Sequence, residues 1–323
     1  MIRHAHAEVP DPNRTHRRRR LAAVATLPTL LTLGNLIFGF VALYQCGLEM
    51  RDIGSGVTPA GHKTLNSDFF EARAPSFLSI AVWMLVGAML CDALDGRLAR
   101  LTRRASKFGE QLDSLADVVS FGVAPALMMV TLMRREVTQL RYAPFGFDPF
   151  MRFSLFIGVI YACCTALRLA RFNVETTLDE SAHRGFKGLP SPGSAGALIS
   201  VILLHDHLDQ TGGWPRLAGT LMRALPVMAL ILALLMVSRV PYGHAVSSFL
   251  RRRPLGHVVV ALLVLPLLWI WSPQTLCLAA WMFVLSGPLK WLYRRARPQL
   301  APAGGPLIGA SGDHPTSAES YRP

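Results

Sequence analysis

The chain has 323 residues, and 51% of them are hydrophobic although the formal net charge is +13. A soluble chain of this length usually forms about two domains whose apolar residues are scattered in short periodic patterns. Here the apolar residues are concentrated in long runs, which argues against a soluble protein. The five cysteines lie in or beside these runs without CxxC spacing, which argues against a disulfide framework or a zinc site.

Long apolar runs along most of the chain predict helices that span a membrane. A bilayer core of about 30 Å needs about 20 apolar residues per helix, and the shorter runs reach that length only with their flanks. We therefore expect an all-α integral membrane protein with about eight transmembrane helices. The runs cover residues 27–46, 75–94, 115–133, 153–170, 194–208, 221–238, 258–271 and 274–292.

Lysine and arginine residues gather in alternate loops between the runs. If the N-terminus is cytoplasmic, 24 of the 33 basic residues fall on the cytoplasmic side. An excess of positive charge is typical of the cytoplasmic loops of membrane proteins. The sequence therefore predicts that both termini and the loop after the second run face the cytoplasm, in a bacterial-type cytoplasmic (inner) membrane.

The two ends of the chain differ from its middle in composition. Residues 1–26 contain the stretch RTHRRRR and are expected to form a disordered cytoplasmic arm that attracts anionic head groups rather than nucleic acid. Residues 293–323 are expected to form a disordered cytoplasmic tail because they are rich in Pro, Gly, Ser and Ala. Between the ends we expect a transmembrane core over 27–238 and additional C-terminal spans over 239–292.

Four aspartates follow the second apolar run, in the stretch CDALDGRLARLTRRASKFGEQLDSLAD at 91–117. On a helix, Asp92 and Asp95 are three residues apart and Asp113 and Asp117 are four apart, so each pair projects from one face. Carboxylates that are close together beside hydrocarbon repel one another and lose hydration unless a cation lies between them. Clustered carboxylate oxygens are the ligands that Mg²⁺, Mn²⁺ or Ca²⁺ prefers. The stretch therefore predicts a divalent metal site.

Small residues and an arginine accompany the aspartates. Gly96 and Gly109 lie in the helical segments that carry them, where a glycine costs about 1 kcal/mol relative to alanine. Because glycine has no side chain, both positions leave the helix surface open, and small Ala99 extends this open surface by one turn. Arg100 has a planar guanidinium that can bind phosphate oxygens. Each residue alone has an ordinary interpretation as a packing glycine, a helix cap or an arginine at the membrane surface. Together they predict a site for phosphate and metal.

The complete pattern resembles the signature of the CDP-alcohol phosphotransferase family, integral membrane enzymes of phospholipid synthesis. The resemblance implies a six-helix core, in which two helices contribute a site for two Mg²⁺ or Mn²⁺ ions. In this sequence the pattern is Asp92-x2-Asp95-Gly96-x2-Ala99-Arg100-x8-Gly109-x3-Asp113-x3-Asp117.

The family resemblance also implies a role for each residue of the pattern. Asp92, Asp95 and Asp113 are implied to be metal ligands, while Asp117 is implied to be the general base that also contacts the second metal. The remaining residues are implied to form the pocket for the cytidine and diphosphate groups. They are Gly96, Ala99, Arg100 and Gly109.

Further stretches resemble the phosphatidylserine synthase branch of this family. The resemblance covers roughly residues 27–200 and includes Asn35, whereas Phe38 stands where many members of the branch have cysteine, with no mechanistic consequence expected. The branch-like stretches are LPTLLTLGNLIFGFVAL at 27–43, DVVSFGVAPA at 117–126, ALRLARFN at 166–173 and FKGLPSPGSAG at 186–196.

This second resemblance implies a substrate pair and a reaction. The hydroxyl group of L-serine would attack CDP-diacylglycerol and release CMP, with Asp117 as the base, and the enzyme would be a homodimer in the membrane. Basic and amide side chains of the branch-like stretches are candidates for holding the serine, although an arginine at a helix end also commonly reaches the membrane surface. The candidates are Arg168, Arg171, Asn173 and Lys187.

Three alternatives stay open at the level of sequence. The acceptor could instead be glycerol 3-phosphate, inositol phosphate or choline, although an acceptor with a phosphate would need further basic residues. An ion-coupled transporter also carries carboxylates in its spans, but such proteins often contain internal repeats, and we find none here. A scaffold without catalysis has no reason to keep all four aspartates together with both glycines and the arginine.

Two smaller motifs have simpler interpretations. GLPSP at 188–192 is typical of a turn that leads into the fifth span. His205 and His207, with Asp206 and Asp209, have residue types that bind metals, but they lie far from the four aspartates in the sequence. We interpret them as ordinary loop residues on the opposite side of the membrane.

Overall fold

The computed structural model describes residues 12–55, 76–102, 107–138, 147–178, 188–212, 214–240, 242 and 273–296. Every secondary-structure element within these ranges is a helix, and one of them, η1, is a π-helix. The elements are α1 (Pro12–Ser55), α3 (Phe77–Thr102), α4 (Lys107–Asp117), η1 (Val118–Val123), α5 (Ala124–Thr138), α6 (Phe147–Leu178), α7 (Ser191–Thr211), α8 (Pro215–Val237) and α11 (Pro273–Ala296).

Six helical stretches within the described ranges are long and apolar enough to cross a membrane. The chain is an all-α integral membrane protein, as the sequence predicts. α7 also belongs to the bundle, but polar residues at both of its ends lower its hydropathy. The expected span over 258–271 lies outside the described residues. The six stretches are Pro28–Ile53, Phe77–Leu98, Phe108–Thr138, Asp148–Glu175, Pro215–Val237 and Pro273–Tyr293.

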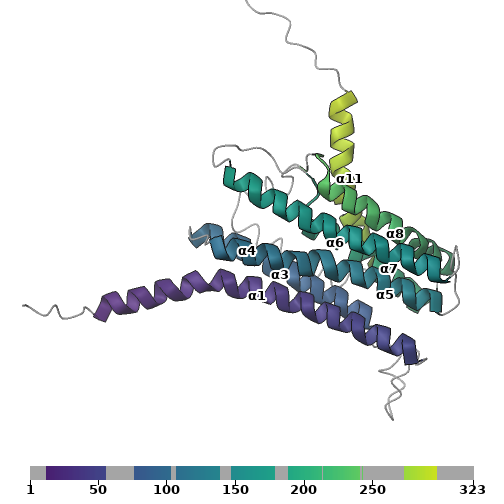
Figure 1. Cartoon of the computed structure of the whole chain (residues 1–323), viewed down its shortest axis with the longest axis horizontal. Helices are drawn as coiled ribbons and strands as arrows, with labels where there is room; N and C mark the ends of the chain where they lie inside the picture. Colours follow the sequence, from purple (N-terminus) through teal and green to yellow (C-terminus); the bar gives the residue numbers. More distant parts are fainter. Residues whose placement is uncertain are drawn as a thin grey trace, which may run out of the picture.

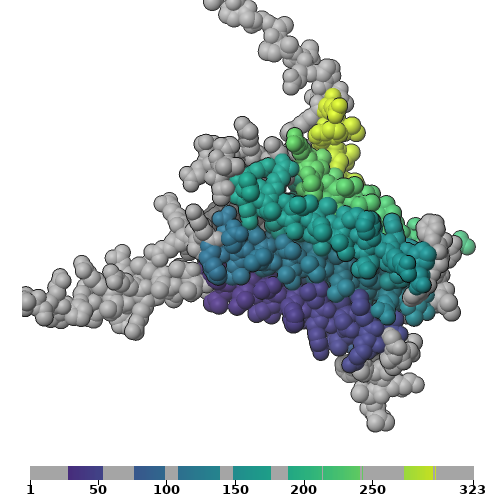
Figure 2. All heavy atoms as spheres, viewed as in Figure 1, coloured from purple at the N-terminus to yellow at the C-terminus, as the bar shows by residue number. Residues whose placement is uncertain are grey.

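The helices form a layered bundle in which α1 lies along one side (Figure 1). α1 packs chiefly against α3, while α7 contacts α3, α5, α8 and α11, and α6 packs against α5 and α8. The space-filling view shows the same order from α1 through α6 to α8 across one face (Figure 2). The interior is filled by large apolar side chains, among them Phe121, Met128, Tyr161 and Leu198.

The π-helix η1 joins α4 to α5 and packs tightly against its neighbours. A Cβ atom added to Gly39 of α1 would collide with Ser120 of η1, and one added to Gly122 would meet the Thr165 side chain of α6 at 3.1 Å. The hydroxyl of Ser120 donates a hydrogen bond to the backbone oxygen of Asn35 at 3.0 Å. Asp117 immediately precedes η1, so these contacts fix its place in the bundle. Short π-helical segments often occur at functional sites.

The predicted turn at GLPSP is confirmed. Gly188 has a φ of 89°, a conformation that glycine adopts without steric cost, and its N–H donates to the backbone oxygen of Val240 at 2.9 Å. Pro190 then caps α7, which begins at Ser191. The turn thereby ties the start of α7 to the segment after α8.

The structure changes the expectation for the N-terminal arm. α1 begins at Pro12, so residues 12–26 are helical rather than disordered, while residues 1–11 lie outside the described range. Extending an existing helix costs far less than starting one, and arginine, leucine and alanine favour helix. At the other end, α11 continues to Ala296, and the rest of the expected tail lies outside the described residues.

Candidate active site

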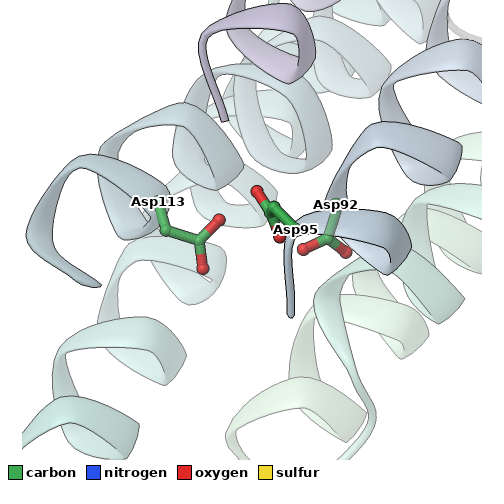
Figure 3. A group of neighbouring side chains, drawn as sticks. All are labelled: Asp92, Asp95 and Asp113. Atoms are coloured by element: carbon green, nitrogen blue, oxygen red, sulfur yellow. The ribbon is translucent and has the colours of Figure 1, made fainter. Parts of the chain in front are cut away.

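Three of the four predicted aspartates form a compact cluster at one end of the bundle. Asp92 and Asp95 come from the last turns of α3, and Asp113 comes from α4 (Figure 3). One carboxylate oxygen from each of the three lies within 4.8 Å of the others. Asp95 is buried, while Asp92 and Asp113 are half-buried. The i, i+3 spacing on α3 places two carboxylates on one face, and the approach of α4 adds the third.

Asp117 lies one helical turn beyond Asp113 and is buried, with 6% of its surface exposed. Its Oδ1 accepts a hydrogen bond from Nδ2 of Asn35 at 3.0 Å. It interacts electrostatically with Asp92 and Asp113, although it does not belong to the group of three whose oxygens lie within 4.8 Å. Its carboxylate is therefore close to the cluster and is oriented by α1.

Helix α1 supplies polar support that the sequence did not identify as part of the site. The hydroxyl of Thr32 is within hydrogen-bonding distance of Asp95 Oδ2 at 3.0 Å, and Asn35 contacts Asp117. Both α1 side chains are buried, with exposed fractions of 4% and 0%. A threonine and an asparagine three residues apart share one face of a helix. That spacing inside an apolar run was the signal available in the sequence, because buried polar groups in spans need partners.

The cluster fits a divalent cation with oxygen ligands. All three side chains offer carboxylate oxygens, the donor set of Mg²⁺ and Mn²⁺, and the ligand-bearing atoms are close enough to share an ion. Asp113 Oδ1 is buried and has no hydrogen-bond partner within the described part of the chain. A buried carboxylate oxygen without a partner is costly unless a bound group neutralises it. The residues present thus suit a metal ion.

The small residues of the pattern border the aspartates along the two helices. A Cβ added to Gly96 would meet nothing within 4 Å, so the surface of α3 is open there, as the sequence predicts. Gly109 lies in the first turn of α4. Ala99 and Arg100 lie in the last turn of α3, and their side chains are outside the described part of the structure. Their predicted contribution to a CDP pocket stays a prediction.

Arg168, one of the candidate acceptor residues, lies within electrostatic reach of the aspartates. Its guanidinium donates a hydrogen bond to the hydroxyl of Ser191 at 2.6 Å, and it interacts electrostatically with Asp117 and Asp92. Ser191 is the first residue of α7 and follows the GLPSP turn. The GLPSP turn therefore positions Ser191 as a hydrogen-bond partner for Arg168. The sequence of the turn does not reveal this role.

The other candidate acceptor residues are less directly connected to the cluster. Asn173 donates a hydrogen bond to the hydroxyl of Ser114, the residue after Asp113, at 2.9 Å. Arg171 pairs with Glu175 on the same helix at 2.8 Å, at a partly exposed position. Lys187 lies outside the described residues. The structure thus brings Arg168 and Asn173 to the site and pairs Arg171 elsewhere.

The histidine and aspartate group at 205–209 is not a loop, so that interpretation is wrong. These residues form the last turns of α7, and His205 and Asp206 are buried. The apolar residues that precede them extend the helix, and buried partners from other helices compensate for their polarity. They lie at the end of α7 away from Ser191 and thus away from the aspartate cluster.

Comparison with known proteins identifies the family. The family model described as CDP-alcohol phosphatidyltransferase matches residues 25–238. The chain belongs to this family. The match covers the helices that carry all four aspartates, and it confirms the resemblance seen in the sequence.

Several relatives of this chain have a more specific name. A CDP-diacylglycerol–serine O-phosphatidyltransferase from Helicobacter pylori is 30% identical over 224 residues, which are 69% of this chain and 84% of the relative. A protein of the same name from Mycobacterium tuberculosis is 35% identical over 42% of this chain and 44% of its own length. One from Methanocaldococcus jannaschii is 34% identical over 48% of this chain and 59% of its own length.

Proposed function

We propose that this chain transfers the phosphatidyl group of CDP-diacylglycerol to the hydroxyl group of L-serine and releases CMP. The observation that carries the proposal is the cluster of Asp92, Asp95 and Asp113 beside the oriented carboxylate of Asp117. Membership in the CDP-alcohol phosphatidyltransferase family supports the lipid donor, and the names of the relatives support serine as the acceptor. The location in the membrane suits a donor whose acyl chains remain in the bilayer.

In the reaction, the serine oxygen forms a bond to the phosphorus that carries diacylglycerol, and the bond from that phosphorus to the oxygen of CMP breaks. A neutral hydroxyl is a weak nucleophile, so a carboxylate at hydrogen-bond distance accelerates attack by accepting its proton. We assign this role to Asp117, and the hydrogen bond that Asn35 donates to one of its oxygens supports the assignment because it orients the carboxylate. Thr32 holds Asp95 in the same way on the neighbouring helix.

The three clustered carboxylates would hold the metal ions, for which we propose two Mg²⁺ or Mn²⁺. When bound, such ions neutralise the diphosphate and make its phosphorus more electrophilic. Arg168 adds a positive charge on α6, within electrostatic reach of Asp92 and Asp117, where it can bind the diphosphate or the serine carboxylate. Asn173, bonded to Ser114, is a second candidate for contact with the serine.

We further propose that the aspartate end of the bundle faces the cytoplasm of a bacterial-type inner membrane and that the enzyme is a homodimer. The bias of 24 of 33 basic residues toward one side supports the orientation. The family resemblance supports the dimer. Serine and CMP are water-soluble, so an active site at the cytoplasmic surface allows both to exchange without crossing the membrane.

Release of CMP tests the reaction. Purified full-length protein in detergent micelles would be supplied with CDP-diacylglycerol, Mg²⁺ or Mn²⁺, and one acceptor at a time. We expect release with L-serine and little with glycerol 3-phosphate, inositol phosphate or choline. Preference for another acceptor would contradict the serine assignment while preserving the chemistry, and absence of release with every acceptor would contradict both.

A binding measurement tests the metal site separately. Electron paramagnetic resonance would count the Mn²⁺ ions bound to the full-length protein and to Asp113→Asn. We expect fewer bound ions in that variant, and no change in Asp148→Asn, which removes an exposed carboxylate at the start of α6. Equal binding by Asp113→Asn and the unaltered protein would contradict the assignment of Asp113 as a ligand.

A further inference from the structure

A second group of charged side chains is buried where α5 and α7 end, at the opposite end of the bundle from the aspartates (Figure 1). Its centre is Arg135, 4% exposed, which donates hydrogen bonds to Glu49 at 3.3 Å and Asp206 at 3.0 Å. The Nε atom of Arg135 also lies 3.5 Å from Glu136. His205, 1% exposed, places its Nε2 atom 3.9 Å from the other oxygen of Glu136.

Within the described part of the chain, this buried group contains more acidic than basic side chains. Three carboxylates, from Glu49, Glu136 and Asp206, surround the single guanidinium of Arg135. The hydroxyls of Ser76 and Ser79 each donate a hydrogen bond to Asp206 at 2.6 Å and thereby partly stabilise its negative charge. Burial of excess negative charge is unfavourable, so a cationic group beside these carboxylates would stabilise the arrangement.

A cavity of about 460 Å³ adjoins the group, within the size range of small-ligand sites. Glu136 and His205 line it as buried residues, and Asp209 lines it as a half-buried one. His205 Nδ1 has no hydrogen-bond partner among the described residues. Arg216 and Arg223 line the cavity as exposed residues. The lining therefore changes from buried acidic groups to exposed basic groups.

We propose that this cavity binds the headgroup of an aminophospholipid. The ammonium group would lie against Glu136 and Asp209, and the phosphate would lie between Arg216 and Arg223 at the exposed side. In a neutral histidine one ring nitrogen is an acceptor, so Nδ1 of His205, which has no partner in the described ranges, can receive an N–H of the ammonium. Guanidinium groups match the geometry of phosphate oxygens.

The position of the cavity favours a lipid over a soluble molecule with the same charges. Arg216 and Arg223 belong to α8, which is one of the candidate membrane spans. Leu217 and Val227 of this helix are 43% and 50% exposed, so its outer surface offers apolar contact to acyl chains. In an aminophospholipid the phosphate lies between the acyl chains and the ammonium, the order in which the exposed arginines and the buried carboxylates occur.

Competition for a fluorescent phosphatidylethanolamine tests the proposal with full-length protein in detergent micelles. We expect phosphatidylethanolamine to compete about tenfold more strongly than phosphatidylglycerol, which has the phosphate but no ammonium. Phosphoethanolamine without acyl chains should compete weakly. Equal competition by phosphatidylglycerol would overturn the ammonium site, and strong competition by phosphoethanolamine would overturn the lipid in favour of a soluble ligand. CDP-diacylglycerol in excess should leave the probe bound, since displacement would place the probe at the aspartates.

Paired variants locate the binding. The double variant R216Q/R223Q should weaken binding of the probe about tenfold, and D209N should reduce the preference for phosphatidylethanolamine over phosphatidylglycerol. The matched control is R134Q/R152Q, which removes two exposed arginines from the same end of the bundle but outside the cavity lining. Equal weakening in this control, or unchanged binding in R216Q/R223Q, would overturn the proposal. All positions in the two double variants are exposed, and thermal unfolding would check that each variant is folded.

Discussion

The two ends of the bundle contain buried carboxylates in opposite settings. At the aspartate end, Arg168 is within electrostatic reach of Asp92 and Asp117 but donates a hydrogen bond to Ser191. At the other end, Arg135 contacts carboxylates of α1 and α7 directly, at 3.3 and 3.0 Å. One end thus keeps carboxylate oxygens available to a ligand, whereas the other uses a protein cation to join helices.

This difference teaches that carboxylates without a contacting protein cation suit binding, whereas Glu49 and Asp206, which Arg135 contacts directly, serve helix packing. Carboxylates gathered without direct ion pairs destabilise the fold until a cation binds, so their replacement should affect activity more than stability. Removing one partner of a buried ion pair leaves an uncompensated charge, so replacements at the other end should affect stability first. Four substitutions test this contrast.

Asp117→Asn should have the largest effect. Loss of the proposed base should lower the rate of CMP release about 10²- to 10⁴-fold. Because Asn35 can still donate to the amide oxygen and repulsion with Asp113 falls, the thermal unfolding midpoint should remain the same or rise. Single-turnover CMP release and thermal unfolding in detergent would measure the two effects. A variant that unfolds at much lower temperature would contradict the contrast between the ends.

Arg135→Met should destabilise the fold by about 3–5 kcal/mol, because Glu49 and Asp206 would remain buried without their cation. The matched control is Arg134→Met, which removes the same charge from the exposed neighbouring position. Denaturant titration in mixed micelles would compare the free energies of unfolding. If the two variants are equally stable, the buried ion group does not hold the helices together.

Asn35→Ala should lower activity about 10- to 100-fold, the usual cost of losing a group that orients a functional side chain. Because Asn35 acts through Asp117, the double variant with Asp117→Asn should be little slower than Asp117→Asn alone. Ser154→Ala serves as a control, since this buried hydroxyl donates only to the backbone of its own helix among the hydrogen bonds observed. Additive losses in the double variant would mean that Asn35 supports the fold instead.

Glu175→Gln should have the smallest effect. The Arg171–Glu175 pair joins residues four apart on α6 and is partly exposed, so its loss should change the free energy of unfolding by about 0.5 kcal/mol or less. The same change at buried Glu49 should cost clearly more, because it weakens a contact of Arg135. Similar costs at both positions would show that burial does not distinguish these ion pairs.

The sequence predicted the membrane class, most of the spans and the aspartate site. Twenty-residue apolar runs have few stable alternatives to transmembrane helices, since a bilayer core requires every backbone group to be hydrogen-bonded internally. The i, i+3 and i, i+4 spacing of the aspartates predicted shared faces, and the structure confirms that Asp92, Asp95 and Asp113 come together. The proposed roles of these residues as ligands and of Asp117 as base stay predictions.

Contacts between distant segments were not visible in the sequence. Thr32 and Asn35 are separated from their aspartate partners by 63 and 82 residues, and Arg135 is separated from Asp206 by 71. Hydrophobic periodicity indicates which face of a helix is buried, but it does not indicate which helix covers that face. The same limit explains why the sequence does not indicate that His205 and Asp206 belong to a buried charge group.

By itself the sequence therefore determined the local properties of this protein: helices long enough for a bilayer, and carboxylates on one side of two of them. Only the tertiary structure decided which polar groups orient those carboxylates, that Arg168 donates a hydrogen bond to Ser191, and how the charges at the other end are compensated. The physical reason is that helix formation and side-chain spacing depend on neighbours along the chain, whereas desolvation and hydrogen bonding depend on neighbours in space.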